Sequence, residues 1–471
     1  MQKQNRISIV YWLILAAAAV LYALLAFSDN IWADEAYTFA MLRRSFPEIW
    51  KITAADVHPP LYYFAAKIGT MAFNYSEYAV RAFSAVCCLL VIAIGGWQIT
   101  HFFDRKKGML FMLLFALYPF VMDHAVEARM YPLAELCIFL NALFAYRVWQ
   151  KSSVGNWIGF TAAGLCAAYT HYFALVSAAA IYGLLFLCIV FRKQNLLRPW
   201  VIASLVTILL YVPWLRNLIA QIAYKAENEY WIDSIGLSTM VDYAEELLHA
   251  NGSAMLPLFF GLLVLWLLVR TCFRHEGIPL LAVLVCVLTA GVGIGASLLM
   301  RPVFIIRYLV PCGALLVFFL AWGLGEIRKD TLYGAAVGVL TVGFLGNAVS
   351  AGLDLIPAEN QFNGAVAQQT GEAQAYVCLS EDAYHLHQIA AYYNPDVPIY
   401  TTETMGDASP YTNVYDIDDF SADDYDTVLV FTDEGVRPAD HFPRGYQATL
   451  YGTYQASYFT FDIWMLEKTA D

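Results

Sequence analysis

The sequence predicts a polytopic α-helical membrane protein with about eleven spans and a small α/β domain at its C-terminal end. Hydrophobic residues make up 60% of the 471 residues and charged residues only 14%. Soluble domains are about half apolar and about a quarter charged, so a simple soluble enzyme is excluded. Apolar runs long enough to cross a bilayer recur between residues 7 and 350. Beyond residue 350 the hydropathy falls.

The charge divides the chain at the same place. Residues 351–471 carry 20 acidic and 3 basic side chains, which leaves 24 basic and 19 acidic side chains in residues 1–350. We therefore expect a transmembrane domain over residues 1–350 and a soluble domain over residues 351–471. The net charge of −12 argues against nucleic acid as a partner.

The first predicted span is Ile7–Phe27. It is longer than the apolar core of a signal peptide and lacks a small-residue cleavage site, so we expect it to stay uncleaved. Ten further spans are expected in apolar segments at residues 82–103, 109–122, 131–146, 157–171, 173–191, 200–214, 255–269, 278–300, 308–324 and 332–350. Residues 60–73 are also apolar. Because counting them as a span would reverse every later loop, we expect a helix on the outer face there.

Basic residues orient these spans. With the N-terminus in the cytoplasm, 14 of the 24 basic residues of the membrane domain fall in inner loops, among them Arg105, Lys106 and Lys107. Inner loops of membrane proteins are enriched in Lys and Arg. The sequence thus predicts a multi-pass protein of the cell membrane with an extracytoplasmic C-terminal domain.

This topology gathers the polar motifs on the outer side. The first outer loop, residues 28–78, holds two of them and the following turns hold the rest: Trp32-Ala33-Asp34-Glu35-Ala36, His58-Pro59-Pro60-Leu61-Tyr62-Tyr63, Glu127-Ala128-Arg129-Met130-Tyr131, His171-Tyr172, Arg301 and Arg307-Tyr308. A longer outer loop is expected over residues 216–252.

Each motif has a plain interpretation and a functional one. Asp34 and Glu35 are either a solvated pair or a general base or metal ligand. His58 either hydrogen-bonds locally beside a rigid Pro-Pro pair or serves the site. Arg129 either pairs with Glu127 at the membrane interface or binds phosphate, which a guanidinium recognises in a bidentate way.

Two other sets of residues leave the same choice open. Arg301 and Arg307 flank an apolar segment and suit an anionic lipid headgroup. Glu135 lies within a predicted span, where a carboxylate is a functional candidate by default. Because it is one turn from Tyr131, it could instead reach the outer water.

Taken in order, these motifs resemble the GT-C superfamily of membrane glycosyltransferases, in the branch of protein O-mannosyltransferases and aminoarabinose transferases (glycosyltransferase family 39-like). The Tyr75-Ser76-Glu77-Tyr78-Ala79-Val80-Arg81 segment adds to the match. The resemblance extends over residues 7–350, and its specific motifs lie within residues 32–131. This chain has His58 where the aminoarabinose transferases carry a lysine.

The resemblance implies spans around an outer-facing cavity and a sugar donor carried on polyprenyl phosphate. It implies that Asp34 is the catalytic carboxylate and that Glu35 and His58 line the cavity. Arg129 would face the donor phosphate or shape the site, and Arg307 matches more loosely by its position. We include Glu127, Tyr131, His171, Arg301 and Tyr308 as further substrate-binding candidates.

The expected reaction is an inverting transfer of the sugar to an acceptor hydroxyl on a lipid, glycan or protein of the cell envelope, with the bilayer as the other partner. Members of the superfamily differ in metal use, and no ligand triad is evident, so assistance by a divalent cation stays open. The alternatives are a flippase or transporter of lipid-linked sugars, for which internal repeats are not clear, and a non-catalytic sensor.

The acidic C-terminal segment alternates between strand and helix patterns. We expect strands at residues 374–379, 397–400 and 427–432, a helix at 384–393 and a terminal hairpin at 446–467. About 121 residues suffice for one small α/β domain.

Overall fold

A computed structural model describes residues 9–469 except 28–30, 228–231, 233, 249–254, 347–348, 350–372, 381, 439–441, 443–444 and 456–459. Within this part, seven helices are long and apolar enough to cross a membrane, and the apolar helices Leu258–Phe273 and Asp330–Gly346 are shorter. The predicted count of about eleven includes segments that form short helices, such as those at 109–122 and 157–171. The chain is thus a multi-pass membrane protein with seven candidate spans.

The described chain forms two compact units that do not follow chain order. The first unit comprises Met1–Phe27, Val57–Phe73 and Glu77–Ser350. Its elements run in this order: α1 (Ile9–Ala26), α4 (Leu61–Thr70), η1 (Met71–Phe73), α5 (Glu77–Phe102), α6 (Arg105–Leu117), α7 (Pro119–Met122), α8 (Tyr131–Gln150), α9 (Val154–Thr170), α10 (Tyr172–Arg192), η2 (Gln194–Leu196), α11 (Leu197–Glu227), α12 (Leu237–Leu248), α13 (Met255–Phe273), α14 (Gly277–Leu299), η3 (Ile306–Cys312) and α15 (Gly313–Gly325).

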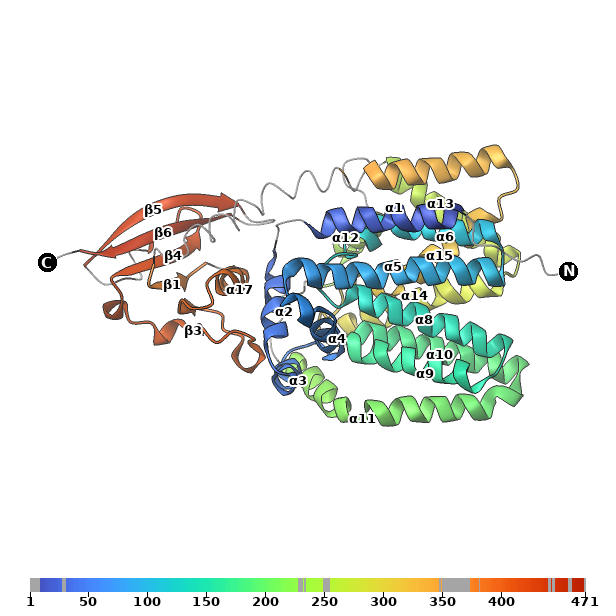
Figure 1. The fold of residues 1–471 in the computed structure, drawn as a ribbon, viewed down its shortest axis with the longest axis horizontal. Coiled ribbons are helices and arrows are strands. Elements are labelled where there is room, and N and C mark those ends of the chain that lie inside the picture. Colours follow the sequence, from blue (N-terminus) through green and yellow to red (C-terminus); the bar gives the residue numbers. More distant parts are fainter. Residues whose placement is uncertain are drawn as a thin grey trace. The chain divides into compact units, whose positions relative to one another are not determined.

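Many of these helices run alongside one another, as α5, α8, α9 and α10 do in Figure 1. Close packing of α5 on α6 depends on two glycines, Gly95 and Gly96. A Cβ at either position would overlap the side chains of Phe111 or Met112. Small residues allow membrane helices to approach closely, which is where their association energy arises.

Two elements of the first unit differ from the sequence prediction. The span expected at residues 200–214 belongs to α11, a 31-residue helix that continues through Pro213 to Glu227. The loop expected at residues 216–252 contains the end of α11 and all of α12. The remainder of that loop includes residues 228–231, 233 and 249–252, which lie outside the described residues. A short helix is present where one was expected at residues 60–73, as α4 and η1.

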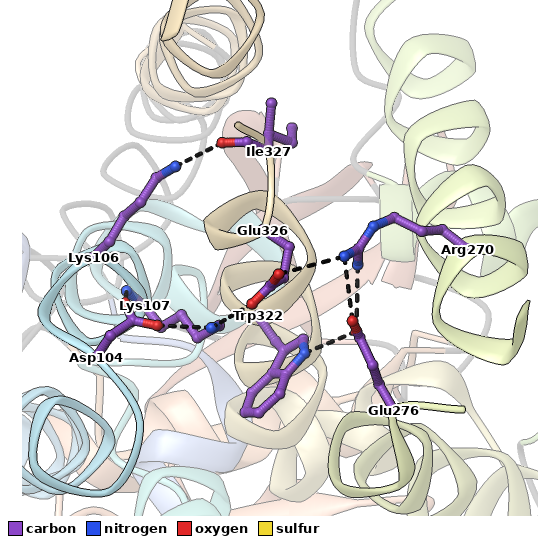
Figure 2. A network of polar contacts seen from close by, with 8 residues as sticks. All are labelled: Asp104, Lys106, Lys107, Arg270, Glu276, Trp322, Glu326 and Ile327. Atoms are coloured by element: carbon purple, nitrogen blue, oxygen red, sulfur yellow. Dashed lines mark hydrogen bonds and ion pairs between the residues drawn. The ribbon is translucent and has the colours of Figure 1, made fainter. Parts of the chain in front are cut away.

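An ionic network joins four helices at the end of the unit where α6 begins (Figure 2). The Lys107 Nζ lies 2.7 Å from Asp104 Oδ2 and 2.6 Å from Glu326 Oε1. Arg270 pairs with Glu276 at 3.2 Å and with Glu326 at 3.6 Å. A buried cation is costly unless it is paired, so these carboxylates fix how α6, α13, α14 and α15 meet.

The second unit comprises Ser28–Asp56, Asn74–Ser76 and Ala351–Asp471. Residues 28–56 and 74–76 of the first outer loop therefore group with the C-terminal segment. Whether residues 1–350 and 351–471 are separate domains stays a prediction. Its elements are α2 (Ala33–Arg43), α3 (Phe46–Ala55), β1 (Ala375–Cys378), α17 (Ala383–Tyr393), β2 (Ile399–Thr401), η4 (Gly406–Ala408), β3 (Val414–Asp416), η5 (Ile417–Asp419), η6 (Ala422–Asp424), β4 (Thr427–Asp433), β5 (Tyr446–Gln455) and β6 (Thr460–Lys468).

The strands form one mixed sheet in the order β3-β2-β1-β4-β6-β5. The pairs β2–β3, β1–β2 and β1–β4 are parallel, and β4–β6 and β5–β6 are antiparallel. The predicted strands, helix and terminal hairpin of this segment are confirmed. The sequence prediction missed β3, because it is three residues long and runs into an acidic stretch. Its pairing with β2 defines it.

Candidate functional site

The predicted site residues fall on both compact units. His58, Glu127, Arg129, Tyr131, His171, Arg301, Arg307 and Tyr308 belong to the first unit, and Asp34 and Glu35 belong to the second. The chain passes from one unit to the other between Asp56 and Val57. Each group is described by itself.

In the first unit, the ring of His171 is the centre of a cluster contributed by four segments. Its centroid lies 6.1 Å from that of His58, 5.7 Å from Tyr131 and 5.1 Å from Tyr308. Residues far apart in the sequence thus converge where α8 and α10 begin. This end of the unit is the one that the sequence predicts to be outer.

The backbone fixes the tautomer of His171. The Nδ1 atom caps α10 by accepting a hydrogen bond of 3.2 Å from the amide of Phe173. Burial lowers the pKa of His171 well below its usual value, and the nearby His58, Arg129 and Arg307 lower it further. A neutral ring that accepts at Nδ1 carries its proton on Nε2. His171 therefore presents one N–H donor in a strongly cationic setting.

His124 has the opposite ionisation. Burial opposes its charge, but the Glu127 carboxylate, at 2.7 Å from Nδ1, raises the pKa of His124 above its usual value. Asp123 contributes in the same direction and Arg307 opposes it. The Ser84 hydroxyl anchors this turn by donating to the Glu127 carbonyl at 2.6 Å. The Glu127 carboxylate in this turn thus favours the charged form of His124.

Two arginines bring positive charge to the cluster. Arg129 is buried just before α8, and Arg307 lies in η3, which packs against α8, α10, α14 and α15. Both interact electrostatically with His171 and Tyr131. Arg129 is therefore not simply an interface side chain, because it is 4% exposed and faces this cluster. Buried guanidinium groups suit a phosphate ligand.

Arg301 lies apart in the loop between α14 and η3. Among the described residues it has no carboxylate partner, and its Nη1 is buried without a hydrogen-bond partner. No contact within the described chain joins it to His171 or Arg307.

Sequence reasoning missed two members of this end of the unit, His124 and Glu246. Helix α12 brings Glu246 near His124 and Arg307. The helix is held by two long-range hydrogen bonds, from Tyr118 to the Leu247 carbonyl and from Tyr243 to the Phe304 carbonyl, both 2.6 Å. Lost hydration raises the pKa of Glu246, while His124 and Arg307 oppose that rise. His124 lies three residues before the motif that begins at Glu127, but nothing in the sequence placed α12 against it.

Glu135 lies in the interior of the first unit, where α8 packs against its neighbours. It is 1% exposed, so the expectation that it could reach outer water is wrong. Its carboxyl occupies the space over Gly313, where a Cβ would lie 2.5 Å from Oε1. Gly313 begins α15, and its lack of a side chain leaves room for this carboxyl at the start of that helix. Glu135 thus joins α8 to α15.

In the second unit, Asp34 and Glu35 lie in the first turn of α2. Glu35 is buried and Asp34 is partly exposed. Both gain from the positive end of the helix dipole, which favours carboxylates there. Asp34 thus has accessible surface, as a base or ligand requires, whereas Glu35 is enclosed.

The helix that carries Asp34 is fixed to the C-terminal segment. Arg44 Nε donates to the Pro410 carbonyl at 2.7 Å, and the Phe39 and Tyr392 rings lie 5.5 Å apart. The buried hydroxyl of Tyr411 also lies close to α2. Burial, with smaller effects of Tyr384 and Asp34, raises the pKa of Tyr411. The orientation of Asp34 therefore depends on the C-terminal domain.

Within the described part of the chain, no group of three or more His, Cys, Asp or Glu is arranged to hold a metal ion. Asp34 and Glu35 are adjacent carboxylates, and adjacency alone defines no coordination site.

The chain is similar to one known protein family over part of its length and to solved structures over nearly all of it. Residues 57–216 match the family of dolichyl-phosphate-mannose-protein mannosyltransferases. No curated protein matches the chain. The structure of ArnT from Cupriavidus metallidurans in the apo state has a TM-score of 0.64 at 13% identity, over 96% of this chain and 97% of that one.

The structure of the same protein bound to undecaprenyl phosphate has a TM-score of 0.62 at 14% identity, over 97% of this chain and 98% of that one. At these sequence identities, the structural similarity shows a shared fold and nothing more. It agrees with a helical membrane body followed by a mixed sheet. Together with the family match, it confirms the resemblance drawn from the motifs.

Proposed function

We propose that this chain, a membrane glycosyltransferase of the family that its residues 57–216 match, transfers a sugar from a polyprenyl-phosphate donor to an acceptor hydroxyl at the outer face of the membrane. The observation that carries the proposal is the cluster around His171. It combines two buried or half-buried arginines, the neutral imidazole of His171 and the His124–Glu127 pair at one end of the membrane unit. Such a set suits a ligand with a phosphate next to polar hydroxyls.

The donor is inferred from the charge of the cluster and from the relatives. Guanidinium groups bind phosphate oxygens in a bidentate way and stay charged. Undecaprenyl phosphate is bound by the ArnT structure described above. We propose the same class of lipid here, with Arg129, Arg307 and the His124 cation near its phosphate and Arg301 as a further contact.

The chemistry requires one base and one set of cations. Asp34 removes the proton from the acceptor hydroxyl, whose oxygen attacks the anomeric carbon. The bond between that carbon and the phosphate oxygen breaks, and its electrons pass to the phosphate. Cations prearranged for this developing charge stabilise the transition state. A single displacement inverts the anomeric centre.

The other candidates would position the sugar and its chain. His171 donates its Nε2 proton to a ligand oxygen, and the rings of Tyr131 and Tyr308 offer flat apolar surfaces beside it. The ring of His58, whose centroid lies 6.1 Å from that of His171, belongs to the same place. Glu127 acts by holding the charge on His124, and Glu35 supports α2. The acceptor is a lipid, a glycan or a protein.

Transfer from labelled polyprenyl-phosphate sugars in membranes tests the proposal. Asp34→Asn should reduce kcat about 10²- to 10⁴-fold, the usual contribution of a general base. Asp407→Asn, at an exposed carboxylate of the same unit, should retain wild-type activity. Undiminished transfer by Asp34→Asn would exclude the base. Movement of the labelled lipid across the membrane without transfer would instead identify a flippase.

Orientation needs its own experiment. We expect an impermeant thiol reagent to label Lys51→Cys from outside intact cells and to label Arg105→Cys only after the membrane is opened. The reverse pattern would place the cluster around His171 on the cytoplasmic side and would contradict transfer at the outer face.

A further inference from the structure

A large cavity lies at the opposite end of the first unit from His171. It has a volume of about 670 Å³ and is formed by α5, α8, α10, α14 and α15. Most of its wall is aliphatic or aromatic, and Arg192 and His275 are its basic lining residues. The volume is within the range of about 300–1,000 Å³ that is usual for ligand sites. Helix α8 separates the two ends by about 30 Å, given 1.5 Å per residue.

A second hollow of about 330 Å³ adjoins this cavity. The two share Gln98, Phe102 and Gln150 as lining residues. The second hollow is more basic, because Arg147 and Lys151 line it. No carboxylate lines either hollow. An apolar chamber thus continues directly into a basic one.

The cations of these hollows differ from their neighbours in the ionic network. Lys107 and Arg270 have carboxylate partners, as Figure 2 shows. Among the described residues, Arg147, Lys151 and Arg192 have none. Within the described part of the chain, the guanidinium of Arg147 lies over the ring of Phe144, 5.4 Å from its centroid. This positive charge is therefore left to be balanced by a ligand or by water.

We propose that the two hollows bind an anionic phospholipid. Its phosphate lies in the basic hollow with Arg147 and Lys151. The first part of an acyl chain fills the adjoining apolar cavity, whose wall includes Arg192. Burying the chain removes apolar surface from water, and guanidinium and ammonium groups complement the phosphate. Basic pockets between membrane helices bind acidic headgroups in this way.

The surroundings favour a membrane lipid over a soluble anion. Helices α5, α8, α10 and α14 are candidate spans, so the apolar cavity opens among segments that lipid surrounds. The sequence places Arg147, Lys151 and Arg192 on the cytoplasmic side, where anionic lipids give the membrane surface a negative potential. This site does not depend on the proposed transfer reaction.

Binding can be measured on the delipidated, detergent-purified full chain by its thermal unfolding. A ligand that binds only the folded state raises Tm. We expect phosphatidylglycerol to raise Tm and phosphatidylcholine to leave it unchanged. The double variant Arg147→Gln/Lys151→Gln should weaken phosphatidylglycerol binding at least about tenfold, the equivalent of 1.4 kcal/mol. Arg198→Gln, an exposed basic residue that lines neither hollow, should bind like the wild type.

A second variant tests the apolar chamber. Leu184→Trp should reduce the effect of phosphatidylglycerol while leaving the basic hollow intact. An equal rise in Tm for wild type and the double variant would overturn the proposal, as would a rise with phosphatidylcholine. Stabilisation by inorganic phosphate alone would show a soluble-anion site. Stabilisation by undecaprenyl phosphate but not phosphatidylglycerol would assign the hollows to the donor lipid instead.

Discussion

The ammonium of Lys107 lies 2.6 Å from the carboxylate of Glu326, although 219 residues separate them in the chain. Lys107 is buried and Glu326 is 30% exposed at its side chain. The hydrogen bond from Lys107 lowers the pKa of Glu326, which burial opposes. This ion pair therefore connects α6 to the end of α15. Each charged group compensates the other for the hydration that it loses on burial.

Glu326→Gln should lower the stability of the first unit. Removing a partner from a buried donor costs about 1–3 kcal/mol, and the remaining bond from Lys107 to Asp104 limits the loss. Asp330→Asn, an exposed neighbour, is the control. Because the pKa of Glu326 is lowered in the folded state, its contribution is present above the unfolded carboxyl pKa of about 4.3 and disappears as the pH falls through the lower folded value. In thermal unfolding, the Tm of the wild type should exceed that of Glu326→Gln at neutral pH, and this difference should disappear in acid. A difference that does not depend on pH would contradict this assignment.

Arg44→Ala should loosen the helix that carries Asp34. Arg44 hydrogen-bonds the Pro410 carbonyl, and a bond to a charged group contributes about 1.5–3 kcal/mol. Hydrogen exchange of the α2 amides should become faster, and kcat should fall more than KM rises. Lys51→Ala is the matched control, because its contact with Asp407 at 3.8 Å is exposed on both sides and contributes little. Equal rates of α2 amide exchange in Arg44→Ala and Lys51→Ala would show that the contact between Arg44 and Pro410 does not hold α2.

The pH profile of transfer should depend on the His124–Glu127 pair. If the His124 cation assists the phosphate, activity falls as the pH rises through its raised pKa. Glu127→Gln removes the charge that raises this pKa. The alkaline decline should then move to lower pH by about one unit, as expected for loss of an adjacent opposite charge. Measuring kcat/KM for the donor across the neutral range checks this. An unchanged alkaline limb would exclude His124 as the titrating group.

Glu246→Gln should strengthen donor binding, in contrast to most changes at this end of the unit. Glu246 brings negative charge near Arg307 and His124, so neutralising it leaves more positive charge for a phosphate. The KM for the donor should fall by about two- to fivefold, since partly exposed charges contribute up to about 1 kcal/mol. The adjacent Glu245→Gln should have no such effect. A higher KM for Glu246→Gln would mean that Glu246 positions Arg307 instead of competing with the phosphate.

The sequence predicts most of the membrane body because hydropathy and the distribution of Lys and Arg are local properties. It also predicts that His58, Arg129, Tyr131 and His171 belong to one site, since their motifs fall in outer loops. It does not predict that α12 lies beside His124, because that depends on hydrogen bonds such as the one from Tyr118 to Leu247. It likewise gives no sign of the contact between α2 and α17. That packing joins two segments far apart in the chain, which no periodicity reveals.

The grouping of residues 28–56 with the C-terminal segment has a consequence for biosynthesis. Arg44 and Pro410 are 366 positions apart, and synthesis at about 5–20 residues per second separates their appearance by about 20–70 s. During this interval α2 and α3 lack the surface on which they will pack, and closing so long a loop slows the contact further. A nascent chain would thus complete its membrane helices before α2, which carries Asp34, packs on the C-terminal segment. Transfer activity would arise only after that last segment has folded.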